Sequence, residues 1–219
     1  MKIHLQKELD RLKKQLFHLA SLVEEILEEA IRAVHEGDVQ LAAGIKAKDR
    51  EIDRLEVEVE EECLKVLALH QPVATDLRFL VAALKMNNDL ERIGDLAVNI
   101  AGGRSCLEGD NKYPVYGEKL NELGQKARAM LRRALESLMY MDVAAARAVL
   151  AADDEVDALY YALVDGVKRD LAQAGADAEE LLCWIMVAKH VERVADQATN
   201  IAEDTIYTVE GAIVRHGRG

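Results

Sequence analysis

The chain is poor in proline and in aromatic residues. Its 219 residues include only two prolines, and Phe, Trp and Tyr together make up 4%. Half of the residues are hydrophobic and 31% are charged. No stretch shows the strict apolar–polar alternation of a half-buried β-strand. This composition is typical of long amphipathic helices, and we expect no β-sheet.

The chain also lacks long apolar runs, excess positive charge and paired cysteine motifs. No apolar run approaches the ~20 residues that span a bilayer, and the N-terminus has no signal-peptide core, so a membrane role would go through a partner protein. The net charge of −12 argues against nucleic acid as a partner, because phosphate backbones need a basic surface. Cys63, Cys106 and Cys183 form no CxxC motif and are odd in number. We therefore expect free, mostly buried thiols in a reducing cytoplasm.

The most informative feature that is present is an internal repeat. The segment ERIGDLAVNIA at 91–101 returns as ERVADQATNIA at 192–202, with seven of eleven positions identical. Upstream, DREIDRL at 49–55 returns as DDEVDAL at 153–159. The two offsets, 101 and 104 residues, nearly agree. The sequence is therefore interpreted as a tandem duplication.

Hydrophobic periodicity predicts an all-α fold of two three-helix bundles, with six long antiparallel helices. The expected helices cover residues 1–35, 38–69, 74–101, 117–140, 143–173 and 177–210. We expect the third helix to end at Gly102-Gly103, because glycine commonly follows the last turn of a helix. The predicted division is a first bundle at 1–106, a linker at 107–116 that contains Pro114, and a second bundle at 117–219.

Both copies keep two acidic pairs with a spacing of four residues, which places each pair on one helix face. In the first copy, Asp53 lies about 18 residues before the short link at Gln71, and Glu91 about 20 residues after it. Antiparallel neighbours would thus bring the pairs to similar heights. The two expected clusters are Asp49, Asp53, Glu91 and Asp95, and Asp153, Asp157, Glu192 and Asp196. Three asparagines, Asn88, Asn99 and Asn200, are candidates for supporting positions.

Two interpretations of these carboxylates compete. Oxygen ligands suit hard cations such as Mg²⁺, Mn²⁺, Ca²⁺ or ferric iron, and carboxylates can bridge two ions. An acidic helix face is, however, more often simply solvated. The nearby basic residues could also neutralise the clusters; these are Arg50, Arg54 and Arg92 in the first copy and Lys189 and Arg193 in the second. Because both pairs recur, cation binding is as well supported as a solvated face.

The run HQPVATDLRFLVAALKMNNDLERIGDLAVNIA, with the later HVERVADQATNIAED, closely resembles the PhoU family of phosphate-signalling regulators. The resemblance covers nearly the whole chain. It implies two bundles side by side and multinuclear metal sites, of iron or zinc, on the eight carboxylates named above. The sequence departs from the repeat at Lys189, where the first copy has Asn88, and we expect this difference to weaken or reshape the second site.

The resemblance further implies a negative regulator of the phosphate-starvation response and of phosphate uptake. Such a regulator is a cytoplasmic adaptor, without enzyme activity, between the ATPase subunit of the high-affinity phosphate transporter and a membrane sensor histidine kinase. We also expect a homodimer, because long bundles often expose an apolar stripe. Two alternatives are a metal-dependent hydrolase that uses carboxylate-bridged metals and a purely structural bundle with acidic faces.

Overall fold

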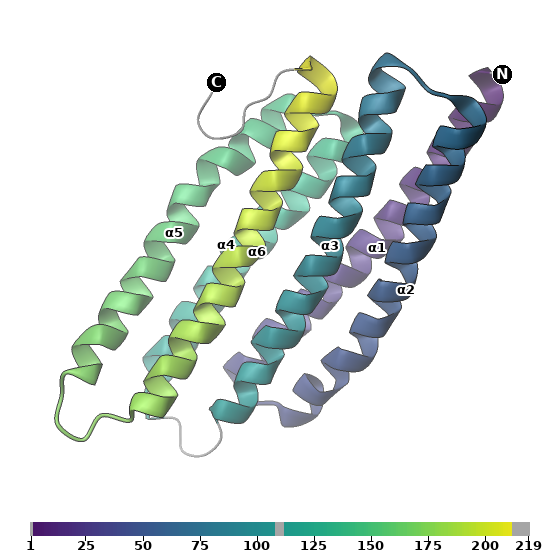
Figure 1. Cartoon of the computed structure of the whole chain (residues 1–219). Coiled ribbons are helices and arrows are strands. Elements are labelled where there is room, and N and C mark those ends of the chain that lie inside the picture. The colour runs from purple at the N-terminus through teal and green to yellow at the C-terminus, as the bar shows by residue number, and fades with distance from the viewer. Residues whose placement is uncertain (1, 108–111, 212–219) are drawn as a thin grey trace.

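The computed structural model describes residues 2–107 and 112–211, and this part of the chain folds into six long helices (Figure 1). Their bounds are α1 Lys2–Glu36, α2 Val39–His70, α3 Ala74–Cys106, α4 Pro114–Tyr140, α5 Val143–Leu171 and α6 Ala178–Glu210. The predicted all-α fold is thus confirmed. No helix in the described ranges is apolar over a stretch long enough to cross a membrane.

Local sequence signals define several of the helix ends. Asp38, Asp142 and Asp177 precede α2, α5 and α6, and each side chain accepts a hydrogen bond from a backbone N–H of the first turn. Such a cap satisfies donors that have no partner inside the helix. Between α1 and α2, Gly37 adopts a left-handed conformation with φ of 73°, which costs glycine little.

The predicted end of the third helix is wrong. α3 continues through Gly102 and Gly103 to Cys106. Gly103 serves a packing purpose instead, because a Cβ atom there would lie 2.2 Å from Cγ2 of Val187 on α6. The linker prediction falls partly on 108–111, outside the described residues, but α4 already begins at Pro114. Proline suits the first position of a helix, where the missing N–H would have no partner.

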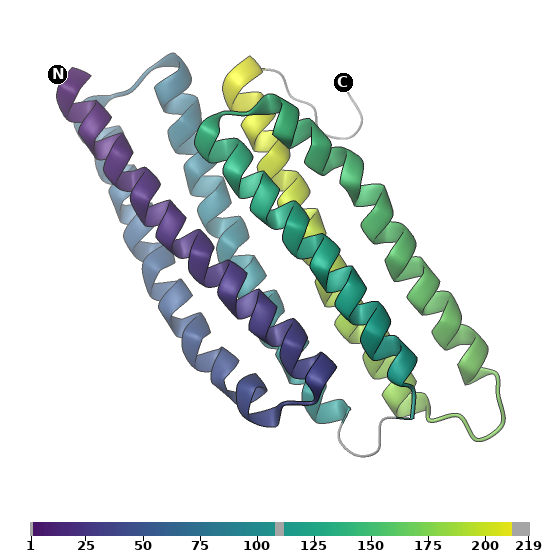
Figure 2. The ribbon, with the colours of Figure 1, turned by 180° about the vertical axis from the view of Figure 1, so that it is seen from behind.

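The helices form two antiparallel three-helix bundles that pack against each other (Figures 1 and 2). Within the bundles, α1, α2 and α3 contact one another, as do α4, α5 and α6. Between the bundles, α1 packs on α4 and α3 packs on α6. The helices α2 and α5 therefore lie at the two outer edges, and the other four form the centre.

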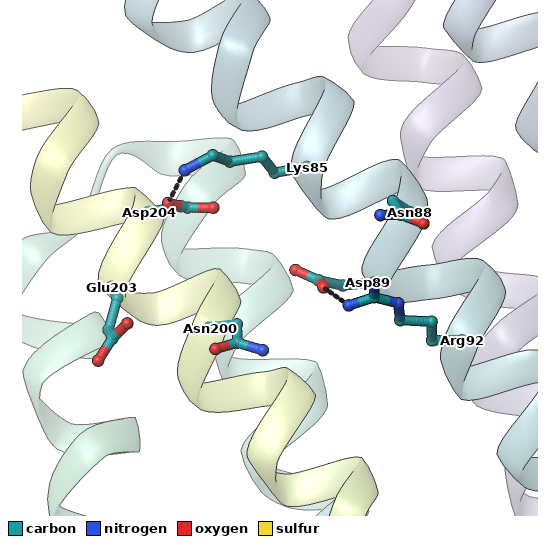
Figure 3. Close-up of a pocket in the computed structure, with 7 residues that line it drawn as sticks. All are labelled: Lys85, Asn88, Asp89, Arg92, Asn200, Glu203 and Asp204. Atoms are coloured by element: carbon teal, nitrogen blue, oxygen red, sulfur yellow. Dashed lines mark hydrogen bonds and ion pairs between the residues drawn. The ribbon is translucent and has the colours of Figure 1, made fainter. Parts of the chain in front are cut away.

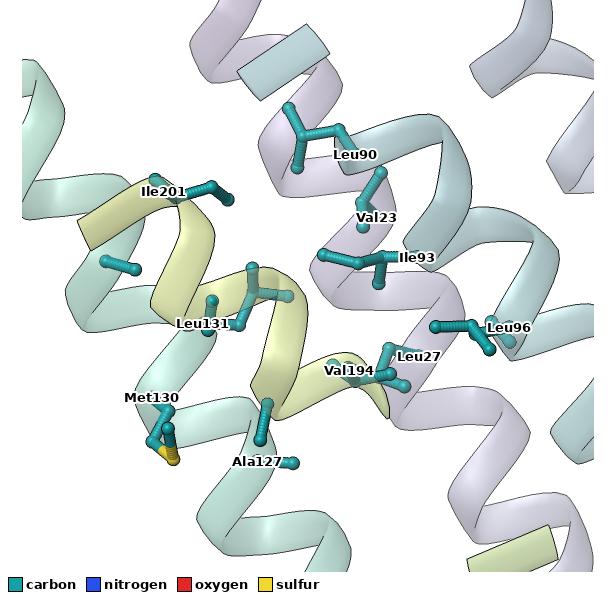
Figure 4. Close-up of a cluster of buried hydrophobic side chains, with 14 of the residues drawn as sticks. Val23, Leu27, Leu90, Ile93, Leu96, Ala127, Met130, Leu131, Val194 and Ile201 are labelled. Carbon is teal, nitrogen blue, oxygen red and sulfur yellow. The ribbon is translucent and has the colours of Figure 1, made fainter. Parts of the chain in front are cut away.

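One continuous hydrophobic core joins the two bundles. Figure 4 shows its middle, where Val23 and Leu27 of α1, Ile93 of α3, Leu131 of α4 and Val194 of α6 point toward one another. α1 contributes an apolar stripe to this core, and each of its members is buried; these are Leu9, Leu12, Leu16, Leu19, Val23, Ile26 and Ala30. The core thus holds the bundles as one body.

The α3–α6 contact, which we call the seam, is antiparallel. Near one end, Lys85 Nζ lies 2.8 Å from Asp204 Oδ1. Near the other end, Cys106 forms a disulfide with Cys183. Cys106 follows Lys85 by 21 residues and Cys183 precedes Asp204 by 21 residues, so the two helices run in opposite directions. The expectation of free thiols is therefore wrong for two of the three cysteines. Cys63 is free and buried, and burial raises the pKa of its thiol to about 12.

Candidate functional site

The first acidic cluster forms where α2 and α3 run side by side. Burial, together with the neighbouring charges of Asp53 and Asp95, raises the pKa of Asp49 to about 6. Burial and the charges of Asp95, Asp53 and Glu56 also raise the pKa of Glu91. Carboxylates influence one another in this way only at short range. The structure therefore brings together the four side chains that the sequence paired across two helices.

A glycine allows α3 to approach Asp49 closely. A Cβ atom on Gly94 would lie 2.8 Å from Oδ1 of Asp49 and 3.4 Å from the side chain of Ile52. That Oδ1 atom is buried and has no hydrogen-bond partner among the described residues. An orphaned buried carboxylate oxygen is costly, so this position favours either a proton or a cation.

The register of α2 against α3 is fixed by a buried asparagine that the sequence did not single out. Asn87 Nδ2 donates to the backbone carbonyl of Glu56 at 2.9 Å and lies 3.1 Å from its Oε1. Glu56 is half-buried, and its own pKa is raised by burial and by the charges of Glu60 and Asp53. Its spacing of three residues from Asp53 could have marked it as a fifth member of the first cluster.

The second acidic cluster repeats this arrangement between α5 and α6. Burial raises the pKa of Asp153 to about 6, aided by the charges of Asp157, Asp196 and Glu192. Burial and the charge of Glu192 raise the pKa of Asp196. Ala195 stands where the first cluster has Gly94. The four expected carboxylates are again neighbours, but α6 has an alanine where α3 has the glycine that contacts Asp49.

The two clusters differ in their ion pairs with basic residues. Within 2–107 and 112–211, no ion pair joins a basic side chain to the four carboxylates of the first cluster. Arg54 pairs instead with Glu51 and Glu58, and Arg92 lies 3.9 Å from Asp89. In the second cluster, Lys189 Nζ lies 2.6 Å from Glu192 Oε2.

The side chains as they lie do not form a closed coordination sphere. Among the described residues, no three Asp, Glu, His or Cys side chains converge closely enough to hold a metal ion. The donor chemistry and the buried, unpartnered oxygen of Asp49 nevertheless fit a hard cation. Bringing several charged carboxylates closer requires a compensating positive charge.

Two of the three asparagines named as supporting positions border a second polar feature of the molecule. Asn88 and Asn200 line a pocket of about 460 Å³ at the seam (Figure 3), and Asn99 is exposed on α3. The pocket is also lined by Lys85, Asp89, Arg92, Glu203 and Asp204. Every lining side chain is polar or charged. No motif predicts this pocket, because it depends on the antiparallel packing of α3 on α6.

Comparison with known proteins matches the chain along its length. The family model described as "PhoU domain" matches residues 16–102 and again 120–205. A PhoU homolog of Aquifex aeolicus, a phosphate-specific transport system accessory protein, is 35% identical over 210 residues, which are 96% of this chain and 95% of that protein. The accessory protein PhoU of Escherichia coli is 30% identical over 213 residues, covering 97% and 88%.

Solved structures agree with these sequence relatives. The crystal structure of PhoU from Pseudomonas aeruginosa matches with a TM-score of 0.90 at 30% identity, covering 94% of this chain and 99% of that one. A phosphate transport system regulatory protein PhoU from Streptococcus pneumoniae matches with a TM-score of 0.89 at 28% identity. The family model covers both repeats and the solved structures share the fold, so the chain belongs to the PhoU family.

Proposed function

We propose that this chain is a non-catalytic accessory protein of a phosphate transport system. The observation that carries the proposal is the extent of the likeness. The family match includes both repeats, and accessory proteins of this name align over about nine-tenths of the chain or more. An adaptor that presents long helical surfaces to other proteins needs no catalytic group.

In this proposal the chain is a cytoplasmic negative regulator. It binds the ATPase subunit of the transporter and a membrane sensor histidine kinase when phosphate is plentiful, and it keeps the kinase inactive. Exposed apolar side chains such as Val81, Leu182 and Met186 offer contact area for partner helices or for a second copy in a homodimer. The acidic surface, with a net charge of −12, favours partners with basic patches.

The regulatory proposal is tested by deleting the gene and measuring phosphate-starvation transcripts in phosphate-rich medium. We expect these transcripts to rise, and reintroduction of the wild-type gene to restore repression. Transcript levels that stay unchanged after the deletion would remove the proposal. Co-purification of the transporter ATPase and the kinase with the tagged chain, in high and in low phosphate, identifies which partner is held.

We also propose that the two acidic clusters bind metal ions, with iron or zinc as the first candidates and Mg²⁺, Mn²⁺ or Ca²⁺ as further ones. The first cluster would hold its metal through Asp49, Asp53, Glu91 and Asp95, and the second through Asp153, Asp157, Glu192 and Asp196. A bound cation neutralises like charges and links the outer helix of each bundle to an inner one. The support is the proximity of the carboxylates, the raised pKa values of Asp49 and Asp153, and the orphaned oxygen of Asp49.

The metal proposal is tested by elemental analysis of protein purified without chelator. A variant with Asp49, Asp53, Glu91 and Asp95 changed to Asn keeps the shape of the first cluster and removes its charge. We expect more than one ion per chain in the wild type and about half as much metal in the variant. Metal near zero in the wild type would contradict the proposal and leave the adaptor function without a cofactor.

A further inference from the structure

The duplicated clusters carry one difference that bears on a ligand. In the second cluster a lysine stands where the first has asparagine: Lys189 is the counterpart of Asn88. The ammonium group of Lys189 lies 2.6 Å from Glu192 Oε2. It also lies 5.2 Å from the centre of the Tyr160 ring on α5, within the range of a cation–π contact.

The position of this ammonium group is defined by two helices. Glu192 belongs to α6 and is 8% exposed, whereas Tyr160 belongs to α5. Lys189 thus joins the same two helices that contribute the carboxylates of the second cluster. In the first copy the position of Tyr160 is taken by Glu56, an acidic neighbour of Glu91.

We infer that Lys189 is a built-in counter-cation of the second cluster, and that the two clusters therefore bind metal cations with different affinity. The inference rests on the metal binding proposed above. In the second cluster a divalent ion must share Glu192 with an ammonium group or displace it. Each cluster has a buried carboxylate oxygen without a hydrogen-bond partner, Asp49 Oδ1 in the first and Glu192 Oε2 in the second, but only the second of these faces an ammonium group. In the first cluster no basic side chain of the described chain forms an ion pair with the four carboxylates, and Glu56 adds negative charge.

Electrostatics sets the size of the difference. A positive charge beside a bound divalent ion repels it strongly at the effective dielectric of a protein surface, but the lysine side chain can swing aside, so we expect an affinity ratio of roughly tenfold. Lys189 is 46% exposed as a side chain, and an exposed ion pair is easily exchanged. The lysine therefore weakens the second site without closing it.

The test is a titration of chelator-treated protein with Mn²⁺ alone, in which free Mn²⁺ is measured by its electron paramagnetic resonance signal. The wild type should show two classes of affinity, and a variant with Asp153 and Asp196 changed to Asn should lose the weaker one. Lys189→Gln should tighten the weaker class about tenfold, whereas Lys189→Arg, which keeps the charge, should not. The reciprocal change Asn88→Lys should weaken the tighter class.

The matched control is Arg193→Gln, which removes a charge near the same cluster without removing an ion pair to it. If Lys189→Gln changes Mn²⁺ affinity no more than Arg193→Gln, or if the wild type binds with a single affinity in both clusters, the inference is wrong while metal binding stands. If the wild type binds no Mn²⁺ and carries no metal when purified, metal binding itself is refuted, and the inference falls with it. Circular dichroism confirms that each variant is folded.

Discussion

Reduction of the Cys106–Cys183 disulfide should lower the stability of the whole molecule. The bond joins the end of α3 to the beginning of α6, and its two cysteines are separated by 77 residues. In the chain-entropy account, closing a loop of this length stabilises the folded state by about 4 kcal/mol, because it restricts the unfolded chain. The continuous core couples both bundles to this loss.

Urea unfolding followed by circular dichroism, with and without a phosphine reductant, measures the difference. A control variant with both cysteines changed to Ala has no disulfide to reduce. Its free energy of unfolding should therefore differ by less than about 0.5 kcal/mol between the two conditions. Thiol titration in denaturant should find one thiol before reduction, from Cys63, and three after it. Equal free energies of unfolding in the two conditions, with three thiols after reduction, would refute the entropic reasoning.

The other predictions concern glycines and pH. Gly103→Ala should destabilise the protein by about 1–3 kcal/mol through overpacking at the seam, whereas Gly102→Ala, with open space around it, should stabilise it by up to about 1 kcal/mol; urea unfolding measures both. Gly94→Ala should displace Asp49 and weaken Mn²⁺ binding in the first cluster, as read by the same titration. The last prediction concerns protein from which metal has been removed with a chelator. Because the pKa values of Asp49 and Asp153 are raised to about 6, the folded state binds more protons than the unfolded state up to about that pH. The free energy of unfolding should therefore fall as the pH rises from 4 to 6. Changing both to Asn should flatten that slope.

The acidic clusters could be predicted from the sequence because they depend on local geometry. Asp49 and Glu91 lie on consecutive helices joined by a three-residue link, so the rise per residue alone sets their heights. The stripe of α1 and the caps at Asp38 and Asp142 are equally local. Each follows from the spacing of apolar residues or from a side chain that reaches its own first turn.

The features that could not be predicted lie at the contact between the bundles. Gly102-Gly103 has the composition of a helix end, but Gly103 is needed for the approach of Val187, which is 84 residues away in the sequence. Cys106 and Cys183 have no recognisable spacing until α3 and α6 are known to be antiparallel. Lys189 could be named as a neutralising charge, but its contact with Tyr160 requires the α5–α6 packing.

The antiparallel seam also shows how the two copies differ. The helices α3 and α6 are equivalent elements of the two copies, so their antiparallel contact has approximate two-fold symmetry. Each contact between a residue of α3 and a residue of α6 therefore has a counterpart at the other end of the seam, formed by the equivalent residues of the other copy. The counterparts of Lys85 and Asp204 are Met186 and Gly103. A charged pair that borders a polar pocket at one end is thus replaced at the other by a tightly packed glycine.

The disulfide follows the same rule. The counterparts of Cys183 and Cys106 are Ala82 and Tyr207, which cannot form a bond, so the covalent link exists at one end only. A symmetric seam would bind the same ligand twice or not at all, whereas this one has a polar pocket at one end and a covalent link at the other. The carboxylates lie between α2 and α3 and between α5 and α6, away from the seam, and each copy has all four. The pocket, Gly103 and the disulfide are thus differences at the surface where the copies meet, whereas Lys189, Tyr160 and Ala195, in place of Asn88, Glu56 and Gly94, make the two acidic clusters unequal.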